Sequence, residues 1–405
     1  MKFIRNLFRW LLCITLICSG FFKLIDPVGT SLKIQEYFGA VGLSVADSVT
    51  LCLGIALATL EFTLGVCLLM RVKIKLVSSV TFLLILFFTI ISFLLVIFNP
   101  IEDCGCFGDV IHLTNWQTLL KNVALLLFAY VTFRQGEKFD RITNNSLEWV
   151  FMGFFAAVAV TIGILTYFYS QHLDFTDYQR GTSLIQDTSV DPYISTFIYE
   201  LDGIEQSFDI NHLPDEKWTY IETKTVENPD YEKAPDFSVL DEDGNELRES
   251  ILAMNNAVII SIYKPEKFEG WDVISDYGDQ VSALGGNYIV LSSRVDENIP
   301  ADFEYPVYFC DYKTLITLNR SNGGVVFIKK GIICDKLSFR EIPPEESVTE
   351  NILNEDEDSL VIKSRIRVRL ATVEFLVVFI VVLYLMKNIC RLTYRGYRRV
   401  KPTEE

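Results

Sequence analysis

Two cysteines separated by one residue, Cys104 and Cys106, have the type and spacing that fit redox chemistry. Two thiols this close in sequence oxidise to each other only by closing a small ring, which strains the disulfide away from its preferred torsion. A strained disulfide is a stronger oxidant than a relaxed one, so it is suited to accept electrons from another dithiol. Gly105 between them supplies the backbone freedom that such a ring needs. We therefore expect Cys104 and Cys106 to form a redox pair.

The acidic neighbours of this pair bear on its reactivity. Asp103 and Asp109 flank the cysteines, and no Lys or Arg lies between them. Negative charges disfavour a thiolate, so we expect raised thiol pKa values and a poor nucleophile. A purely structural disulfide or a packed loop is the alternative. No metal site is predicted, because His112 is the one nearby histidine and the spacing suits zinc poorly.

The cysteine loop interrupts a series of apolar stretches that are long enough to cross a bilayer. The first ends at Ile25, and the others cover residues 49–70, 76–98, 117–133, 149–169 and 370–390. The basic start resembles that of a signal peptide, but no small-residue cleavage site follows, which favours a retained helix. After Asp26-Pro27, residues 31–45 are amphipathic and too short to span, so we expect them at the outer surface.

Basic residues predict the orientation of these spans. They lie before the first span, after the second and the fourth, and in the tail after residue 390, which places both termini in the cytoplasm. The exception is a cluster before the last span, namely Lys363, Arg365, Arg367 and Arg369. We expect a protein of the bacterial inner membrane, with the cysteine loop and the large domain in the periplasm.

The segment between residues 171 and 364 is strongly acidic, since it holds about three quarters of all Asp and Glu. This charge predicts a water-exposed domain and argues against nucleic acid and anionic lipid surfaces as its partners. Its first part, 171–233, reads as a β-rich module or a linker with strands at 195–199 and 218–221. Its second part has strands at 257–263, 288–291 and 305–309 and a closing hairpin at 324–334. With a helix after the first of these strands, this is the order of a thioredoxin-like domain.

This predicted domain lacks the thiols of a thioredoxin site. Where the helix after the first core strand would begin with a cysteine pair, the chain reads Lys264-Pro265-Glu266-Lys267-Phe268, and Gly323-Gly324 stands where a proline is usual. We expect it to bind a partner rather than to exchange disulfides. Cys310 and Cys334 could pair, which the sequence leaves open. The other cysteines lie in apolar runs and are interpreted as small hydrophobic residues: Cys13, Cys18, Cys52, Cys67 and Cys390.

Glu61 lies near the middle of the second span. A carboxyl group at that depth is unfavourable and marks a functional or bundle-internal position. We expect Glu61 to be protonated or hydrogen-bonded and to relay protons when the cysteines change redox state. Lys23, near the outer end of the first span, is interpreted as reaching water without a partner.

Three stretches together resemble the four-helix membrane core of DoxX and MauE-like proteins: 19–27, Glu61 with Gly65, and 104–109. The resemblance covers roughly the first third of the chain. Ala234-Pro235-Asp236-Phe237 also resembles the opening of a peroxiredoxin or TlpA-like thioredoxin fold. These resemblances imply a multi-pass α-helical membrane bundle, a periplasmic α/β thioredoxin-like domain and a C-terminal transmembrane helix. The expected divisions are 1–134 (core), 135–170 (cytoplasmic loop and fifth span), 171–233 (β-rich module or linker), 234–355 (thioredoxin-like domain) and 356–405 (last span and basic tail).

The resemblance also implies a redox role for Cys104 and Cys106, because the bundle is related in architecture to quinone-linked thiol oxidases. The first hypothesis is a membrane thiol-disulfide oxidoreductase that passes electrons between a periplasmic or membrane protein partner and quinone. The second is a non-enzymatic assembly or scaffolding subunit of an envelope complex with a structural loop disulfide. A small-solute transporter is the weakest hypothesis, because four short spans with one midplane carboxyl are few for a pathway.

Overall fold

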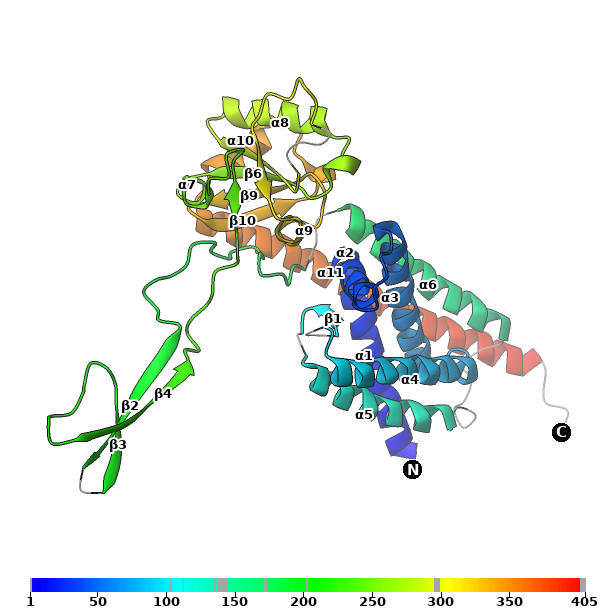
Figure 1. Cartoon of the computed structure of the whole chain (residues 1–405). Coiled ribbons are helices and arrows are strands. Elements are labelled where there is room, and N and C mark those ends of the chain that lie inside the picture. Colours follow the sequence, from blue (N-terminus) through cyan, green and yellow to red (C-terminus); the bar gives the residue numbers. More distant parts are fainter. Residues whose placement is uncertain are drawn as a thin grey trace.

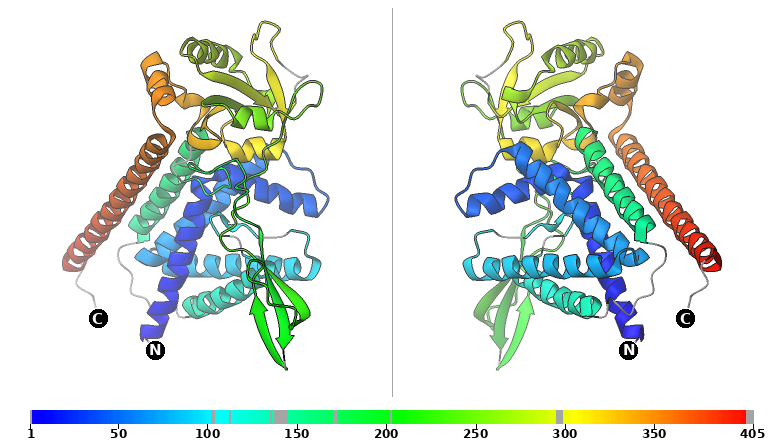
Figure 2. Two further views of the ribbon diagram at one scale, coloured as in Figure 1. Left: turned by 90° about the vertical axis from the view of Figure 1, so that its left-hand side faces the viewer. Right: turned by 90° about the vertical axis from the view of Figure 1, so that its right-hand side faces the viewer.

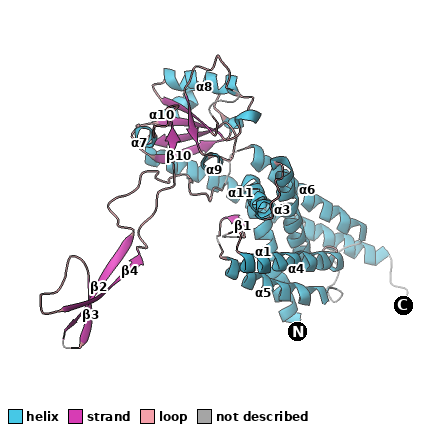
Figure 3. Ribbon diagram, in the orientation of Figure 1, coloured by secondary structure: helices cyan, strands magenta, loops and turns pink. Residues whose placement is uncertain are grey.

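The protein combines a bundle of long helices with a separate sheet-containing unit. A computed structural model describes residues 2–101, 104–111, 113–134, 136, 145–169, 173–201, 203–294 and 299–400. Figure 1 shows the helices on one side, the sheet unit above them, and a narrow arm of strands that projects away on two long connections. Figure 3 shows that the bundle is helical apart from the short extended segment β1 (Cys106–Asp109).

Six of the described helices are long and apolar enough to cross a bilayer, as the sequence predicts. They are α1 (Lys2–Ile25), α3 (Asp47–Met70), α4 (Ile74–Phe98), α5 (Asn115–Arg134), α6 (Asn145–Phe168) and α11 (Glu357–Val400). The chain is therefore a multi-pass membrane protein that lies in a lipid bilayer. Helix α1 begins and α11 ends at the end of the bundle opposite the sheet unit (Figure 2).

The short helix α2 (Pro27–Ala40) starts and ends earlier than the amphipathic segment predicted at 31–45. Its first turn explains the start. Pro27 occupies the first helical position, where its missing N–H removes no hydrogen bond, and the Asp26 carboxylate accepts a hydrogen bond from the Gly29 N–H.

Helices α1 and α3 pack unusually closely, because glycines lie at their contact. A Cβ on Gly20 would lie 2.5 Å from the Phe62 backbone nitrogen, and one on Gly65 would lie 2.9 Å from the Ile17 backbone nitrogen. Small residues of this kind let helix backbones approach in a membrane. The approach brings polar side chains of α1 within hydrogen-bonding reach of Glu61 on α3.

The sheet unit, residues 239–354, is built on a mixed sheet in the order β10-β9-β6-β7-β8-β5. Its central strands β6, β7 and β8 are parallel, and β9, β10 and β5 join antiparallel at the two sides. The strands are β5 (Val239–Leu240), β6 (Ala257–Ile262), β7 (Asn287–Ser292), β8 (Val307–Cys310), β9 (Gly324–Lys329) and β10 (Ile332–Leu337). The core strands and the closing hairpin predicted from the sequence are all present.

Helices cover both faces of this sheet. Helix α8 (Trp271–Ala283) and α10 (Glu346–Asn354) pack with the buried side chains of one face, and α7 (Arg248–Leu252) and α9 (Tyr312–Leu318) with those of the other. Short 3-10 turns complete the unit, η2 (Pro265–Lys267) and η3 (Phe339–Glu341). The single helical stretch predicted after residue 263 is therefore two pieces, because η2 ends at Lys267 and α8 begins only at Trp271.

The arm is a sheet in the order β3-β2-β4. Its strands are β2 (Tyr193–Leu201), β3 (Ile204–Phe208) and β4 (Thr219–Glu227), so the sequence predicts two of the three and misses β3. Aromatic side chains pack edge to face on it: Tyr199 with Phe208 and Tyr220, and Phe208 with Trp218. The connection that leads into the arm bonds Ile333 on the outer edge of β10 through Gly181 and Thr182, and Leu184 bonds Gly331 just before this strand, so this part of the edge is covered.

The sheet unit is docked on the bundle by ion pairs. Asp26, between α1 and α2, bonds Arg320 at 3.0 Å, and Asp47, at the start of α3, bonds Lys264 at 2.6 Å. Arg367 of α11 pairs with Asp335 of β10, and Arg365 donates to the Arg180 backbone oxygen. Lys363 also pairs with Glu355, so the basic cluster before the last span, which runs against the charge rule, contacts the acidic segment 171–364 through Lys363, Arg365 and Arg367.

Candidate redox site

The cysteine loop connects α4 to α5 and is closed by an asparagine. The Asn115 side chain, at the start of α5, donates to the Asn99 side chain and to the Ile101 backbone oxygen, each at 2.8 Å. Gly105 adopts a left-handed conformation with φ +61°, which glycine takes without a steric penalty. Within this loop the Sγ atoms of Cys104 and Cys106 are 2.9 Å apart, and both thiols are free. The structure thus brings the two predicted redox residues together.

Two hydrogen bonds from the bundle hold the backbone of this pair. The Tyr37 hydroxyl of α2 donates to the Cys104 backbone oxygen at 2.9 Å, and the Ser19 hydroxyl of α1 lies 2.8 Å from the Cys106 backbone oxygen. Each cysteine is therefore positioned by a different helix.

Glu61 is part of a buried polar network. Its carboxylate binds the Lys23 ammonium at 2.7 Å, and the two residues are 1 % and 7 % exposed. The interpretation of Lys23 as unpaired is therefore wrong, because the close approach of α1 and α3 gives it a counter-ion. Such a pair resolves the problem of an isolated charge in the bilayer, provided that hydrogen bonds complete it.

Ser19 connects this network to the cysteines. Its hydroxyl lies 2.8 Å from Glu61 Oε2 and 2.8 Å from the Cys106 backbone oxygen, and it also accepts from Lys23. A hydroxyl has one hydrogen, so Ser19 donates to one of these two acceptors at a time. Ser19 therefore links Glu61 to the backbone of the cysteine loop.

The pKa values of the two thiols are shifted in opposite directions. The hydrogen bond from Cys104 lowers the pKa of the Cys106 thiol to about 6, and although burial opposes this, the Lys121 and Lys23 ammonium groups lower the pKa further. The same hydrogen bond, together with burial, raises the pKa of Cys104. The expectation that acidic neighbours raise both values is wrong for Cys106, because Lys121 approaches it from α5. Asp103 and His112 lie outside the described residues.

A cavity of about 380 Å³ opens beside the cysteines. Its walls come from α1 to α5, and most of the surface that they expose to the cavity is apolar, with Leu57, Phe87 and Phe88 among the residues that line it. Nine polar side chains also line it: Thr15, Ser19, Lys23, Thr30, Lys33, Tyr37, Glu61, Lys121 and Asn122. This volume lies in the range of small-molecule sites. A mostly apolar surface with some polar groups is also typical of such sites.

The remaining cysteines do not join this site. Cys310 on β8 and Cys334 on β10 are free, and four strand spacings separate β8 from β10, about 19 Å, which is far beyond disulfide reach. Burial raises the pKa of Cys310 to about 12 and of Cys334 to about 11, so both are poor nucleophiles. Cys13 and Cys67 are buried, as interpreted, whereas Cys18 is half-buried and Cys52 is exposed on a membrane-spanning helix. The side chain of Cys390 is not among those described, and within the described ranges no group of His, Cys, Asp and Glu forms a metal site.

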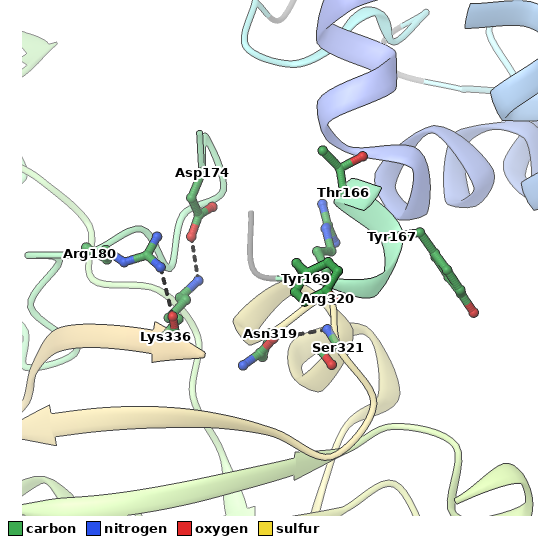
Figure 4. A pocket seen from close by; sticks show the side chains of 9 residues that line it. All are labelled: Thr166, Tyr167, Tyr169, Asp174, Arg180, Asn319, Arg320, Ser321 and Lys336. Carbon is green, nitrogen blue, oxygen red and sulfur yellow. Dashed lines mark hydrogen bonds and ion pairs between the residues drawn. The ribbon is translucent and has the colours of Figure 1, made fainter. Parts of the chain in front are cut away.

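A second polar cluster lies where the sheet unit meets the bundle (Figure 4). Lys336 bonds Asp174 at 2.6 Å, and Arg180 donates to the Lys336 backbone oxygen and pairs with Asp335. The adjacent cavity measures about 20 Å³, room for one water molecule. Because its charged side chains are paired, we interpret this cluster as structural.

Sequence reasoning missed Tyr37 and Lys121 and did not assign Ser19 a role. A lysine five residues inside the span predicted at 117–133 is itself unusual, and that could have pointed to Lys121. Nothing in the sequence indicates Tyr37, because its contact depends on how α2 folds back over the loop.

Two family models match parts of the chain. Residues 193–227, which form the arm, match a domain of unknown function, DUF8463. No curated protein and no solved structure was found to match the chain. The helices that carry Ser19, Lys23, Tyr37 and Glu61, together with the cysteine loop, lie in residues 1–134, and this part of the chain matches the family model of methylamine utilisation protein MauE.

Proposed function

We propose that this protein is a thiol-disulfide oxidoreductase of the bacterial inner membrane in which Cys104 and Cys106 exchange electrons with the thiols of a partner protein. The observation that carries the proposal is the free cysteine pair itself, with Sγ atoms 2.9 Å apart, positioned by Ser19 and Tyr37 and facing cationic side chains. A structural loop would need neither an acidified thiol nor a cavity beside it.

The difference in pKa between Cys104 and Cys106 determines the order of the exchange steps. Starting from a Cys104–Cys106 disulfide, a partner thiolate attacks Cys104 Sγ and expels Cys106 as the thiolate, because the sulfur of lower pKa is the better leaving group. The partner's second thiolate then attacks the mixed disulfide and releases Cys104, which takes up a proton. The partner is oxidised by two electrons, one disulfide bond forms in it, and the Cys104–Cys106 bond breaks.

Glu61 is the proposed proton carrier of this cycle. It is hydrogen-bonded through Ser19 to the backbone of Cys106 and is paired with Lys23 inside the bundle. Proton uptake at Glu61 would release the Ser19 hydroxyl to donate fully to the loop, which couples the carboxyl group to the redox state of the cysteines.

The sheet unit is the proposed partner-binding module, with a thioredoxin-like fold. The parallel core strands, the antiparallel closing hairpin and helices on both faces support that fold. The loop that would carry its thiols, at Lys264–Lys267, instead contacts Asp47 of the bundle. We place this unit and the cysteine loop in the periplasm and both termini in the cytoplasm, which agrees with the ends of α1 and α11 lying together.

Trapping the mixed disulfide tests the proposal. In membranes, the Cys104 thiol of a Cys106→Ser variant should attack the disulfide of an oxidised partner, which is the reverse of the second step. The mixed disulfide should accumulate as a reducible band on a non-reducing gel, because no Cys106 thiolate remains to resolve it. Cys104→Ser should accumulate much less. The full-length protein should also exchange with dithiothreitol, monitored by alkylation of Cys104 and Cys106. Glu61→Gln should slow this exchange without preventing assembly of the bundle.

A scaffolding role with a structural loop is the competing function. It would be supported if the pair remained inert toward dithiothreitol and if a Cys104→Ser, Cys106→Ser double variant kept the biological role of the protein. Normal exchange and normal assembly in the Glu61→Gln variant would exclude the proton role and leave Glu61 as a packing residue.

A further inference from the structure

Arg369 stands apart from the other residues of the basic cluster before the last span. Lys363, Arg365 and Arg367 contact the acidic segment, whereas Arg369 makes no hydrogen bond or ion pair with any residue that the structure describes. Arg369 is exposed and precedes Leu370, where the apolar part of α11 begins. An arginine at the end of a membrane-spanning segment lies at the level of the lipid headgroups, so its guanidinium is available to a lipid phosphate.

Arg365 and Arg369 form a pair of like charges on one side of α11. They are four residues apart, and Thr372 follows three residues later, so these three side chains lie along one stripe of the helix. Two arginines at this spacing repel each other, so an anion bound between them would be stabilising. Arg365 gives two of its five N–H groups to the Arg180 backbone oxygen, which leaves donors for a second acceptor. Glu374 lies about 140° around the helix from Arg369, too far to neutralise it.

Beside this stripe, a cavity of about 210 Å³ lies between α1, α6 and α11. Apolar side chains such as Leu165 line most of it, and its two threonines donate their hydroxyl hydrogens to backbone oxygens, Thr372 to Val368 and Thr166 to Leu24. Water needs several polar partners and would be poorly held there, whereas a hydrocarbon chain fits. The volume is below the usual range of sites for whole small molecules, so the cavity suits part of a longer ligand.

The cavity exists because α11 contacts the rest of the protein on either side of it. Residues 363–367 bind the acidic segment on one side, and on the other side Phe379 packs against Phe62 of α3 with ring centroids 5.5 Å apart. Ile25, the last residue of α1, lines the cavity. The cavity therefore lies at the end of the bundle next to the sheet unit, which is also the end where Arg369 lies.

We propose that α11 and the bundle bind one anionic phospholipid, with its phosphate between Arg365 and Arg369 and one acyl chain in the cavity. Guanidinium groups bind phosphate oxygens through paired, charge-assisted hydrogen bonds. Thr372, which lines the cavity, is about 4.5 Å along the helix axis from Arg369, so the headgroup and the chain of a single lipid can occupy both places. The inference does not depend on the proposed redox function, and it gives a role to a basic residue that runs against the charge rule.

The experiment uses the full-length protein, purified in detergent and given an equimolar mixture of phosphatidylglycerol and phosphatidylcholine. Native mass spectrometry measures which lipid each protein molecule retains. We expect one phosphatidylglycerol, retained at least about fivefold more often than phosphatidylcholine. Arg369→Gln should lower this retention about fivefold, because one cation near a lipid headgroup contributes about that factor. Arg134→Gln, at the end of α5, is the matched control and should change retention less than about twofold.

Two tryptophan variants of α11 locate the acyl chain. Ala371→Trp fills the cavity and should also lower retention at least about fivefold. Val373→Trp, about 200° around the same helix on its exposed side, should stay within about twofold. Each variant should elute from size-exclusion chromatography as the wild type does, and if the tryptophan in Ala371→Trp disturbs assembly, Arg369→Gln still decides the question.

Three results would overturn the inference. If no lipid is retained, the cavity is not a lipid site. Equal retention of phosphatidylglycerol and phosphatidylcholine would mean that the cavity takes any acyl chain without selecting an anionic headgroup. Equal retention in Ala371→Trp and Val373→Trp would mean that the lipid binds elsewhere. Exchange of Cys104 and Cys106 with dithiothreitol should be the same in all these variants, so failure of this inference and failure of the proposed function are separate observations.

Discussion

The acidic residues next to Cys106 in the sequence would raise the pKa of its thiol. In the folded chain, however, two ammonium groups act on this thiol. Lys121 comes from α5 and Lys23 from α1, and both lower the pKa of Cys106 after the hydrogen bond from Cys104. The local sequence misleads here because electrostatic effects act over a few ångströms of space rather than along the chain.

Replacing Lys121 should therefore make Cys106 less acidic. In Lys121→Met, the pH at which Cys106 becomes half alkylated should rise by about 1 unit from its value near pH 6, because an opposite charge has been removed. The thiolate is the reactive form and is present above the pKa of the thiol. At about pH 6.5, half a unit above the wild-type pKa, the variant should therefore react several-fold more slowly than the wild type. The measurement is the rate of alkylation of Cys106 against pH, read by mass spectrometry of the loop peptide.

Lys33→Met is the matched control. Lys33 lines the same cavity but is not among the groups with the largest effect on the pKa of Cys106, so its removal should shift the alkylation midpoint less than removal of Lys121 does. Equal midpoints for Lys121→Met and the wild type would show that Lys121 does not act on the thiolate.

In the cysteine loop, a side chain is less easily accommodated at Gly105 than at Gly108. Gly105 and Gly108 both have φ +61°, but a Cβ on Gly105 would lie 2.9 Å from Lys33 Cγ, whereas one on Gly108 would have nothing within 4 Å. The two positions therefore separate the penalty of a left-handed backbone, about 1 kcal/mol for a non-glycine residue, from the effect of crowding against α2.

Gly105→Ala should slow closure of the Cys104–Cys106 disulfide more than Gly108→Ala does. Both variants incur the left-handed penalty, and Gly105→Ala in addition displaces either Lys33 or the loop. We expect Gly108→Ala to reduce the rate of closure about fivefold at most and Gly105→Ala to reduce it further. The measurement is the rate of disulfide formation in the reduced protein after an oxidant is added, and equal rates would indicate that Lys33 moves aside freely.

The helices and strands differ in how far the sequence could predict them. The spans and the strands of the sheet unit were predictable, because apolar periodicity and run length are local properties. The Lys23–Glu61 pair was not, because it requires α1 and α3 to meet at Gly20 and Gly65. Strand β3 was missed because its residues alternate weakly, and it forms by pairing with β2.

In the whole molecule, the Lys264–Lys267 loop of the sheet unit contacts the helical bundle. Asp47 accepts the Lys264 ammonium at 2.6 Å and lies 3.6 Å from Lys267, and Gln35 of α2 donates to the same carboxylate. This loop is therefore occupied by a contact within the chain. The partner protein that we propose would have to bind the sheet unit elsewhere or displace this contact.

A charge exchange tests whether this contact holds the unit in place. Asp47→Lys should increase hydrogen exchange in the 264–270 segment about fivefold, since a partly exposed pair contributes up to about 1 kcal/mol. The double variant Asp47→Lys, Lys264→Asp should recover much of the protection, because the pair is restored with its sign reversed. Any unfavourable interaction of the introduced lysine with the N-terminus of α3 remains in both variants, so the difference between them isolates the contact.

Glu222→Lys on the arm is the control, because it makes a comparable charge change at an exposed position and should leave exchange in the 264–270 segment unchanged. If the double variant does not recover protection, the apolar packing of Val28 and the Asp26–Arg320 pair are sufficient to hold the unit on the bundle.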